Sequence, residues 1–294
     1  MKLNKGDLVT RLSYNRDLLF RISEIRSTVV ELVGEDMRLL ADAPIEDLVL
    51  VSEEERTKML QKSKEVEESS YHLFRQDAKL LKQRGEYEVT SGYASDIDFF
   101  ELRGRVLHID GDSLYLKKCT ALYEKLGVPV YGVHLHEKEM PEQIGSLIEI
   151  VQPDIIVVTG HDAYLKSRGN EGDIRSYRHT KYFAECVRIA RRYTWHRDDL
   201  VIFAGACQSH FETLIKAGAN FASSPERVNI HALDPVYIAS RISLTSFMDR
   251  IHLTEILRNT ITGERGLGGI ETKGIMRRGM PLKEGYNRIY IEQS

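Results

Sequence analysis

From residue 105 onward, short runs of consecutive apolar residues alternate with longer segments in which apolar residues recur at helical spacing. Short apolar runs bounded by turn residues are typical of strands buried on both faces, and the longer segments are typical of amphipathic helices. The expected strands are residues 106–109, 130–134, 155–159, 200–204, 219–223 and 230–233, and the expected helices are residues 114–126, 140–151, 179–193 and 211–217. This alternation predicts a parallel sheet covered by helices on both faces, an α/β/α sandwich.

The first 51 residues have a different pattern. Short segments rich in β-branched and other apolar residues are separated by Gly, Asn and Pro, with no helical periodicity between them. The expected strands are residues 7–11, 19–25, 29–33 and 37–41. Several short strands in so little chain predict a small SH3-like β-barrel, for which a scaffolding or docking role is the simplest interpretation.

A charged segment connects these two regions. Ser52, followed by Glu53, Glu54 and Glu55, has the composition of a helix start, because a hydroxyl caps the first turn and acidic side chains favour the positive end of the helix dipole. We expect a solvated helix over residues 52–84 and a Gly-, Ser- and Tyr-rich linker over residues 85–100. The predicted organisation is therefore a barrel (1–51), a connector (52–100) and an α/β domain (101–294).

Composition excludes several classes of protein. Of the 294 residues, 42% are hydrophobic and 29% are charged, which is typical of a folded chain, and the net charge of −3 provides no basic field for nucleic acid. No apolar run approaches the length of a membrane span, and the N-terminus lacks the apolar region of a signal peptide. Three cysteines cannot form a dense disulfide framework. We therefore expect an intracellular, cytoplasmic protein with no membrane span and no nucleic-acid partner; the oligomeric state stays open.

Candidate chemistry follows two of the expected strands. His161 follows strand 155–159 after one glycine, and Cys207 follows strand 200–204 after Gly205 and Ala206. One helix fits between the two strands, so they can be neighbours in the sheet, with both side chains at its carboxyl edge. An imidazole beside a thiol produces a nucleophile. Taken singly, a buried cysteine or a histidine at a strand end is more often a packing residue.

The other potential sites are less well supported. Cys119 and Cys186 lie within expected helices and are interpreted as structural. Residues 133–137 contain two histidines and a glutamate, but neither His-Glu-x-x-His nor Cys-x-x-Cys occurs, so we expect no metal and no other cofactor. Residues 263–269 are Gly-rich but lack the Lys-Ser/Thr ending of a phosphate-binding loop, and are expected to be a flexible loop.

A histidine and an Ala-Cys pair at the ends of successive strands resemble the catalytic arrangement of the caspase–gingipain–legumain class of cysteine peptidases. A second resemblance covers nearly the whole chain and is to the YabG family of sporulation-specific proteases. The segments that carry it are residues 6–11, 106–112, 160–164, 203–212, 218–225, 229–235 and 266–272. The second resemblance implies a protease of the sporulating mother cell that processes spore coat and cortex-associated proteins at the forming coat.

The resemblance to caspase-like peptidases also implies a mechanism. Cys207 would attack the scissile carbonyl as a thiolate, and His161 would protonate the leaving amine and then activate water. Backbone amides at Cys207 and after the histidine would form the oxyanion hole. The residue after the histidine is usually glycine in that class, and this sequence departs from that pattern with Asp162.

Acidic residues at the same edge suggest a specificity. Asp110 and Asp112 follow strand 106–109, and Asp162 follows His161. Carboxylates in a substrate pocket favour Arg or Lys, so we expect cleavage after basic residues, Arg in particular. The alternative is that these acids only cap a helix or close a turn. Self-cleavage is expected at an exposed loop, and residues 167–176, with two arginines, are the best candidate.

Two other functions are compatible with the sequence. Glutamine amidotransferases also place a cysteine after a strand, in a Gly-x-Cys-x-Gly turn, but Ser209 occupies the position of the second glycine. A non-enzymatic adaptor for coat assembly, with the barrel as its docking module, is the other alternative. Turnover of peptides, turnover of glutamine, or an inert Cys207 would distinguish the three.

Overall fold

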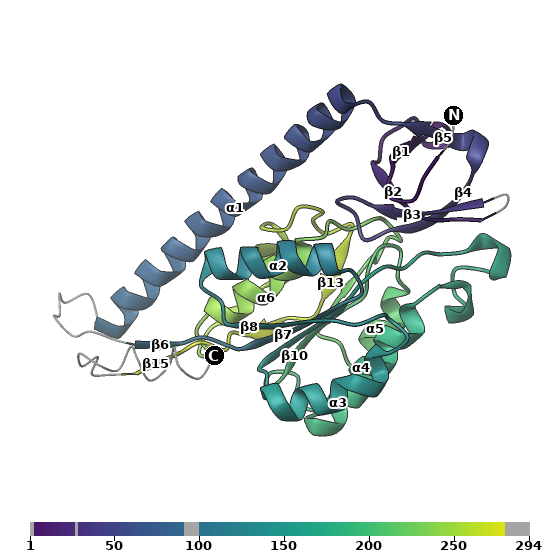
Figure 1. Cartoon of the computed structure of the whole chain (residues 1–294). Helices are drawn as coiled ribbons and strands as arrows, with labels where there is room; N and C mark the ends of the chain where they lie inside the picture. The colour runs from purple at the N-terminus through teal and green to yellow at the C-terminus, as the bar shows by residue number, and fades with distance from the viewer. Residues whose placement is uncertain (1–2, 27–28, 91–99, 280–294) are drawn as a thin grey trace.

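The computed structural model describes residues 3–26, 29–90 and 100–279, which form two sheet-containing regions connected by a long helix (Figure 1). The first region is a five-stranded antiparallel sheet with the strand order β4-β3-β2-β1-β5. Its strands are β1 (Leu8–Arg11), β2 (Phe20–Ile25), β3 (Val29–Gly34), β4 (Leu40–Pro44) and β5 (Leu48–Leu50). Alternate residues of β2 and β3 are buried, as expected for a sheet with one face on a core.

The long helix α1 (Glu53–Thr90) begins at the predicted position. The backbone N–H of Glu55 donates to Oγ of Ser52 at 3.2 Å, and the N–H of Ser52 donates to the Glu55 carboxylate at 3.2 Å, which forms a capping box. The predicted linker is wrong over residues 85–90, where the helix continues. Gly85 lowers helix stability by only about 1 kcal/mol, which is too little to end a helix rich in Glu, Lys and Gln. The rest of that linker, 91–99, lies outside the described residues.

The second region contains a six-stranded sheet with the order β13-β11-β10-β9-β7-β8. The strands β8, β7, β9, β10 and β11 pair in parallel, and β13 is antiparallel at the edge. Their bounds are β7 (Val106–Asp110), β8 (Val130–His134), β9 (Ile155–Thr159), β10 (Val201–Ala204), β11 (Phe221–Ser223) and β13 (Leu267–Gly269). Every residue of β7, β9 and β10 is buried, because helices cover both faces of this sheet.

Helices cover the two faces of the central sheet in two separate layers (Figure 1). One layer contains α2 (Ser113–Leu126) and α6 (Asp234–Leu244), and the other contains α3 (Met140–Val151), α4 (Thr180–Tyr193) and α5 (Phe211–Ala217). The smaller elements are β6 (Phe100–Leu102), β12 (Arg250–Ile251), α7 (Leu253–Leu257), β14 (Thr272–Lys273) and β15 (Arg277–Gly279). Short 3-10 turns lie between β1 and β2, between β4 and β5, and between β9 and α4. The fold is therefore mixed α/β, with an antiparallel N-terminal sheet and a largely parallel central sheet flanked by helices.

Two segments of this region differ from the prediction. Residues 230–233 are not a strand: they contain a single β-bridge, from His231 to Met37, and α6 begins immediately afterwards. Nearly every residue of α6 is buried, so it has no amphipathic pattern from which to predict it. The predicted loop at 263–269 ends in β13, where a Cβ on Gly269 would lie 2.4 Å from the carbonyl oxygen of Asn220. The glycines there permit close strand pairing.

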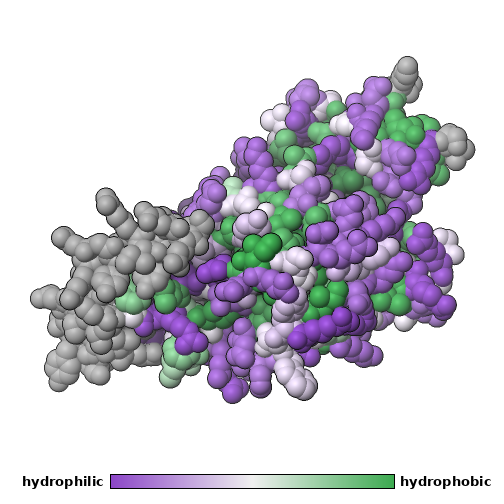
Figure 2. Space-filling model, turned by 60° about the horizontal axis from the view of Figure 1, so that its bottom comes forward, coloured by the Kyte–Doolittle hydropathy of each residue, from purple (hydrophilic) through white to green (hydrophobic). Residues whose placement is uncertain are grey.

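The surface is mixed in polarity. On the face shown in Figure 2, apolar residues occupy small areas separated by hydrophilic side chains. Among the described helices, none is long and apolar enough to cross a membrane.

The chain between β3 and β4 extends from the N-terminal sheet to the carboxyl edge of the central sheet. Met37 forms an antiparallel bridge with His231, and Leu39 forms a parallel bridge with Asp162. This explains why β4 begins at Leu40, later than the predicted start at residue 37: the preceding residues pair with the other region of the molecule. The N-terminal sheet is therefore in contact with the edge at which the candidate residues lie.

Candidate active site

Cys207 and His161 occupy equivalent positions on neighbouring strands. The strands β9 and β10 pair in parallel, with Val158 opposite Ala204. His161 lies three residues beyond Val158, and Cys207 lies three residues beyond Ala204. This confirms the prediction that the two strands are neighbours, and it places both side chains at the carboxyl edge of the sheet.

A tight turn holds the cysteine. Gly205 has a φ of +109°, and a Cβ there would lie 2.3 Å from Oγ of Ser223, so the turn requires glycine. The hydroxyl of Ser223 donates to the carbonyl of Ala206 at 2.7 Å, and the N–H of Ala206 donates to Oγ of Ser209 at 3.0 Å. With the preceding peptide fixed in this way, the backbone N–H of Cys207 is directed to the chain between β3 and β4, where it donates to the carbonyl of Arg38 at 3.1 Å.

The Cys207 thiol is completely buried in this state of the chain. Its Sγ accepts a hydrogen bond from the backbone N–H of Ile230 at 3.2 Å and lies 3.5 Å from the Ile230 carbonyl oxygen. Burial raises the pKa of the thiol well above its ordinary value, so the neutral form predominates. Within the described residues, no hydrogen bond or ion pair connects Sγ to the imidazole of His161.

His161 lies between two carboxylates. Its Nε2 is 3.4 Å from Oδ2 of Asp112, and its Nδ1 is 3.6 Å from Oε1 of Glu137. The same Glu137 oxygen accepts the backbone N–H of His161 at 2.8 Å. Burial alone would lower the pKa of His161, but the two carboxylates raise it to about 9, and the pKa of Glu137 falls to about 2. His161 is therefore an imidazolium at neutral pH, with a proton available to donate.

Asp112 has two structural roles. It is the N-cap of α2, where its Oδ1 accepts the N–H groups of Leu114 at 2.7 Å and Tyr115 at 3.1 Å, while its other oxygen faces His161. Despite its burial, the hydrogen bonds and the imidazolium hold the pKa of Asp112 well below its usual range. Asp112 therefore both caps α2 and orients the imidazole, and it lies outside the guanidinium pocket described below.

The carboxylate of Asp162 belongs to the framework of the site. One oxygen accepts the N–H groups of Ala163 at 2.9 Å and His179 at 2.8 Å, and the other accepts the hydroxyls of Ser209 at 2.8 Å and of Thr180. Each oxygen has two donors from this chain, so the side chain has no acceptor capacity left for a substrate cation. We therefore do not expect the Asp162 side chain to bind a substrate cation. This does not affect the predicted role of its backbone N–H in the oxyanion hole.

Asp110, at the end of β7, forms the base of a pocket filled by Arg38. The Nη1 of Arg38 lies 3.0 Å from Oδ1 and 2.9 Å from Oδ2 of Asp110, and both side chains are fully buried. Other acceptors surround the guanidinium: the carbonyl of Ala232, at 3.2 Å from Nε and 2.8 Å from Nη2, and Sγ of Cys119, at 3.4 Å from Nη2. The ring of Tyr115 lies 5.2 Å from Cζ. Every nitrogen of the guanidinium therefore has an acceptor.

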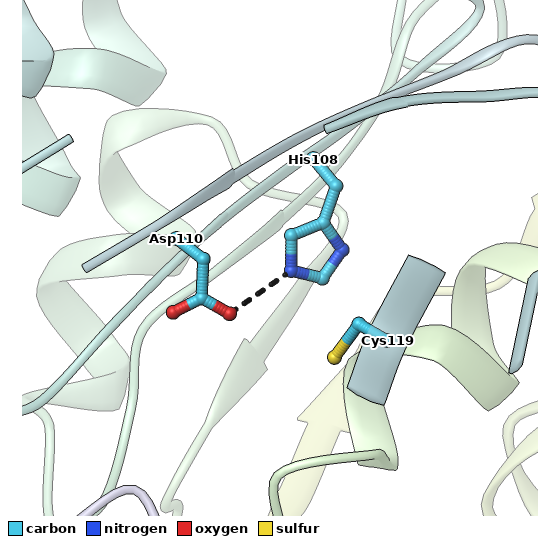
Figure 3. A group of neighbouring side chains, drawn as sticks. All are labelled: His108, Asp110 and Cys119. Carbon is cyan, nitrogen blue, oxygen red and sulfur yellow. Dashed lines mark hydrogen bonds and ion pairs between the residues drawn. The ribbon is translucent and has the colours of Figure 1, made fainter. Parts of the chain in front are cut away.

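The wall of this pocket also contains a possible metal-ligand set. Figure 3 shows His108 and Asp110 from β7 facing Cys119 from α2, and their ligand atoms lie within 4.8 Å of one another. Nε2 of His108 is 3.3 Å from the Asp110 carboxylate. However, the Arg38 guanidinium already supplies the positive charge here, and burial raises the pKa of Cys119 to about 12, which opposes the thiolate that a metal needs. The donor set fits a guanidinium better than a metal ion.

Sequence reasoning missed three residues of this site. The sequence indicates Glu137 only as part of a possible metal cluster, and it gives no signal for Tyr115 or Arg38. Glu137 lies in the connection between β8 and α3, and its buried position beside His161 depends on packing that no local motif indicates. Arg38 comes from the other region of the molecule, more than a hundred residues away in sequence from Cys207.

The elevated pKa of His161 leads to a prediction about stability. A basic group whose pKa is higher in the folded state stabilises that state below its unfolded pKa, and the stabilisation is lost as the pH rises through the folded value. Between pH 6.5 and about 9, we expect the free energy of unfolding to fall by about 3 kcal/mol through this group. The measurement is urea unfolding across that range in a Cys207→Ala background, which removes a thiol that ionises within this range only in the unfolded chain.

Substituting His161 with Gln in that background should flatten the pH dependence. The same substitution at His196, which is exposed, should leave it unchanged. An unaltered slope in the His161 variant would contradict the carboxylate–imidazolium arrangement.

Comparisons with known proteins agree on one family. The model of the family described as YabG peptidase U57 matches residues 4–281. The sporulation-specific protease YabG of Bacillus subtilis (strain 168) is 54% identical over 288 residues, which is 96% of this chain and 99% of the relative. No solved structure matches the chain significantly.

Proposed function

Because the chain belongs to the YabG peptidase U57 family of sporulation-specific proteases, we propose that it is a cysteine endopeptidase with Cys207 as nucleophile and His161 as acid–base group. Membership in the family establishes protease activity and protein substrates. The catalytic type, the residues and the specificity are the proposal.

One observation carries the proposal. The carbonyl of Arg38 accepts the N–H of Cys207 at 3.1 Å, while the side chain of the same Arg38 fills the Asp110 pocket at 2.9 Å. A residue on the acyl side of a scissile bond must make these two contacts at once, one to stabilise the developing oxyanion and one to be recognised. The site thus contains an arginine held in the manner of a substrate.

The reaction uses the groups in a fixed order. The Cys207 thiol first releases its proton to solvent, since His161 is already protonated, and the thiolate then attacks the carbonyl carbon. The C–N bond breaks as His161 donates its proton to the leaving nitrogen. A thioester to Cys207 results. His161, now neutral, takes a proton from the water that attacks the thioester, so that the thiolate is released and a carboxylic acid forms. The net reaction consumes one water for each peptide bond.

The oxyanion would be held by backbone amides. The N–H of Cys207 is one donor, as its contact with Arg38 suggests. The second would come from the backbone of Asp162, which lies opposite Leu39 in a parallel bridge and hence beside the Arg38–Leu39 peptide bond. This pair of positions, with the histidine and cysteine on adjacent parallel strands, is the basis for describing the domain as caspase-like.

The pocket favours arginine over lysine. Asp110 supplies both carboxylate oxygens, and the Ala232 carbonyl and the Cys119 sulfur accept from the other side of the guanidinium. A lysine ammonium is a compact charge that cannot reach all of these acceptors at once, so it would leave buried acceptors unpaired. We therefore assign Asp110, in place of Asp112 or Asp162, as the acid that selects cleavage after Arg.

The biological setting is proposed from the family. The substrates would be spore coat and cortex-associated proteins, processed in the mother cell at the forming coat, without a cofactor. The N-terminal sheet would be an SH3-like barrel (residues 1–51), joined by a connector to a peptidase domain that starts near residue 101.

Replacing His161 with Ala tests the assignment of the acid–base group. General acid–base catalysis contributes about 10²- to 10⁴-fold, and we expect kcat/KM on Arg-containing peptides to fall by this factor. Cleavage products of an Arg-containing and Arg-free peptide mixture would be mapped by mass spectrometry. The matched control is His196→Ala at an exposed position, which should cleave like the wild type. Equal activity of the two variants would refute the role of His161.

A further inference from the structure

The segment at residues 36–39 lies in the cleft as an added strand. The N–H of Arg38 donates to the carbonyl of Ile230 at 3.1 Å, and the N–H of Ala232 donates to the carbonyl of Asp36 at 2.8 Å. These bonds flank the antiparallel bridge between Met37 and His231. Main-chain pairing with an exposed sheet or strand edge is a general way in which extended peptides are bound. The residues that precede Arg38 are therefore held as a peptide substrate would be.

Side chains of α2 fix the register of this segment. Nζ of Lys118 lies 2.9 Å from Oδ1 of Asp36, and the hydroxyl of Tyr115 donates to the carbonyl of Met37 at 2.8 Å. Both contacts come from the helix that Asp112 caps, next to His161. The segment is thus anchored on both sides of its backbone, and Arg38 cannot shift without breaking several polar contacts.

The segment also closes the cleft. Arg38 and Cys207 are both inaccessible to solvent, and Leu39 is 7% exposed. A protein substrate has no access to the thiol or to the Asp110 pocket while residues 36–39 remain in place. The covalent connections to β3 and β4 keep the segment at a high effective concentration beside the site (Figure 1).

Building on the proposed function, we propose that residues 36–39 are a tethered substrate: they close the cleft of the intact chain, and Cys207 of the same chain cuts the Arg38–Leu39 bond to open it. The reaction is the hydrolysis described above, with the Arg38 carbonyl carbon as the electrophile and the nitrogen of Leu39 as the leaving group. One water is consumed, and the products are chains 1–38 and 39–294. Breaking this bond removes the connection from Arg38 to β4, which frees the segment to leave.

The loop at residues 167–176, predicted above as the self-cleavage segment, lacks such contacts in the described part of the chain. The side chain of Arg175 is 86% exposed and pairs with Asp173 at 2.8 Å. Cleavage in this loop stays a prediction from the sequence. The new N-termini distinguish the two sites: Leu39 for the tethered segment, and Gly169 or Ser176 for the loop.

The test is a time course of the purified full-length protein, followed by intact mass and N-terminal sequencing. We expect a new N-terminus at Leu39, with a first-order rate constant that does not change on dilution, because the cut is intramolecular. Turnover of an Arg-containing peptide in the same samples should show a lag that matches the appearance of this N-terminus. Detection of the Leu39 N-terminus in the wild-type protein does not depend on whether any variant folds.

Two substitutions provide the comparison. Arg38→Gln should reduce formation of the Leu39 N-terminus by at least about 100-fold, because the buried acceptors of the pocket lose their partner. Arg26→Gln removes an exposed arginine just beyond the end of β2, paired with Glu24 at 2.7 Å, and should leave self-cleavage unchanged.

The outcomes separate this inference from the proposed function. Peptide turnover by the wild type without a Leu39 N-terminus would overturn the inference and leave the peptidase assignment intact. A rate that rises with protein concentration, or turnover without a lag, would also overturn it. Failure of every form to cleave either itself or the peptide would instead refute the proposed function.

Discussion

Replacing Cys207 with Ala is expected to reduce peptide cleavage to background, a loss of about 10⁴-fold or more, because it removes the nucleophile that forms the acyl intermediate. Cys119 contacts the Arg38 guanidinium, and burial raises its pKa to about 12, so it cannot substitute as the nucleophile. Cys186 is buried in α4, within the core on the other side of the sheet. The prediction is checked by measuring kcat/KM with fluorogenic Arg peptides.

Cys186→Ala is the matched control for this experiment. It removes a buried thiol of the same size, and its activity should remain within a few-fold of the wild type. Folding needs an independent check, because Cys207→Ala leaves the buried N–H of Ile230 without its sulfur partner, at a cost of about 1–3 kcal/mol. A folded Cys207→Ala variant that still cleaves peptides would exclude a cysteine mechanism at this position.

The central sheet and its two candidate residues were predictable from the sequence for a physical reason. Strands buried on both faces are nearly continuous apolar runs, and the polar residues that follow them must lie at the carboxyl edge. The predicted strands at 130–134 and 155–159 match β8 and β9 without change, and the pairing of β9 with β10 brings His161 and Cys207 to one edge. The hydrophobic pattern therefore predicts where the backbone of each strand ends. In a parallel sheet with this simple topology, that is enough to place the residues that follow the strands.

The same reasoning could not assign the acids. Asp110, Asp112 and Asp162 follow strands in similar ways, but each has a different partner: a guanidinium, a helix N-terminus with an imidazole, and a set of backbone and hydroxyl donors. Which partner each finds depends on contacts between residues far apart in sequence. Arg38 illustrates the limit, because it belongs to the N-terminal sheet and nothing in its local sequence indicates a role in the site of the other region.

The predicted boundaries failed where tertiary contacts override local preference. Residues 37–39 have the composition of a strand in the N-terminal sheet, yet they pair instead with His231 and Asp162. Likewise, the glycines at 268–269 suggest a loop, but they form the close pairing of β13 with β11. In both places a short segment is stabilised by a partner strand that the sequence alone does not identify.

The second large effect concerns the pocket. Asp110→Asn keeps the shape of the side chain but removes its charge, so we expect kcat/KM on Arg peptides to fall by about 100-fold or more. In the intact chain the same change leaves the Arg38 cation buried without a counter-charge, which should destabilise the closed arrangement of residues 36–39 by about 3–5 kcal/mol. Thermal unfolding measured alongside the kinetics separates a loss of stability from a loss of recognition.

Peptides with citrulline in place of arginine isolate the role of the charge, because citrulline has nearly the same shape and is neutral. The wild type should strongly prefer Arg peptides over citrulline peptides. Asp110→Asn should lose most of this preference, because its activity should fall on Arg peptides and not on citrulline peptides. Asp112→Asn is the matched control: it should keep the preference and, since it removes one of the two carboxylates that raise the pKa of His161, move the alkaline limit of the pH–rate profile to lower pH. If Asp112→Asn abolished the Arg preference and Asp110→Asn retained it, the arginine of a substrate would bind elsewhere than the pocket that Arg38 fills, and the likeness between Arg38 and a substrate residue would be lost with it.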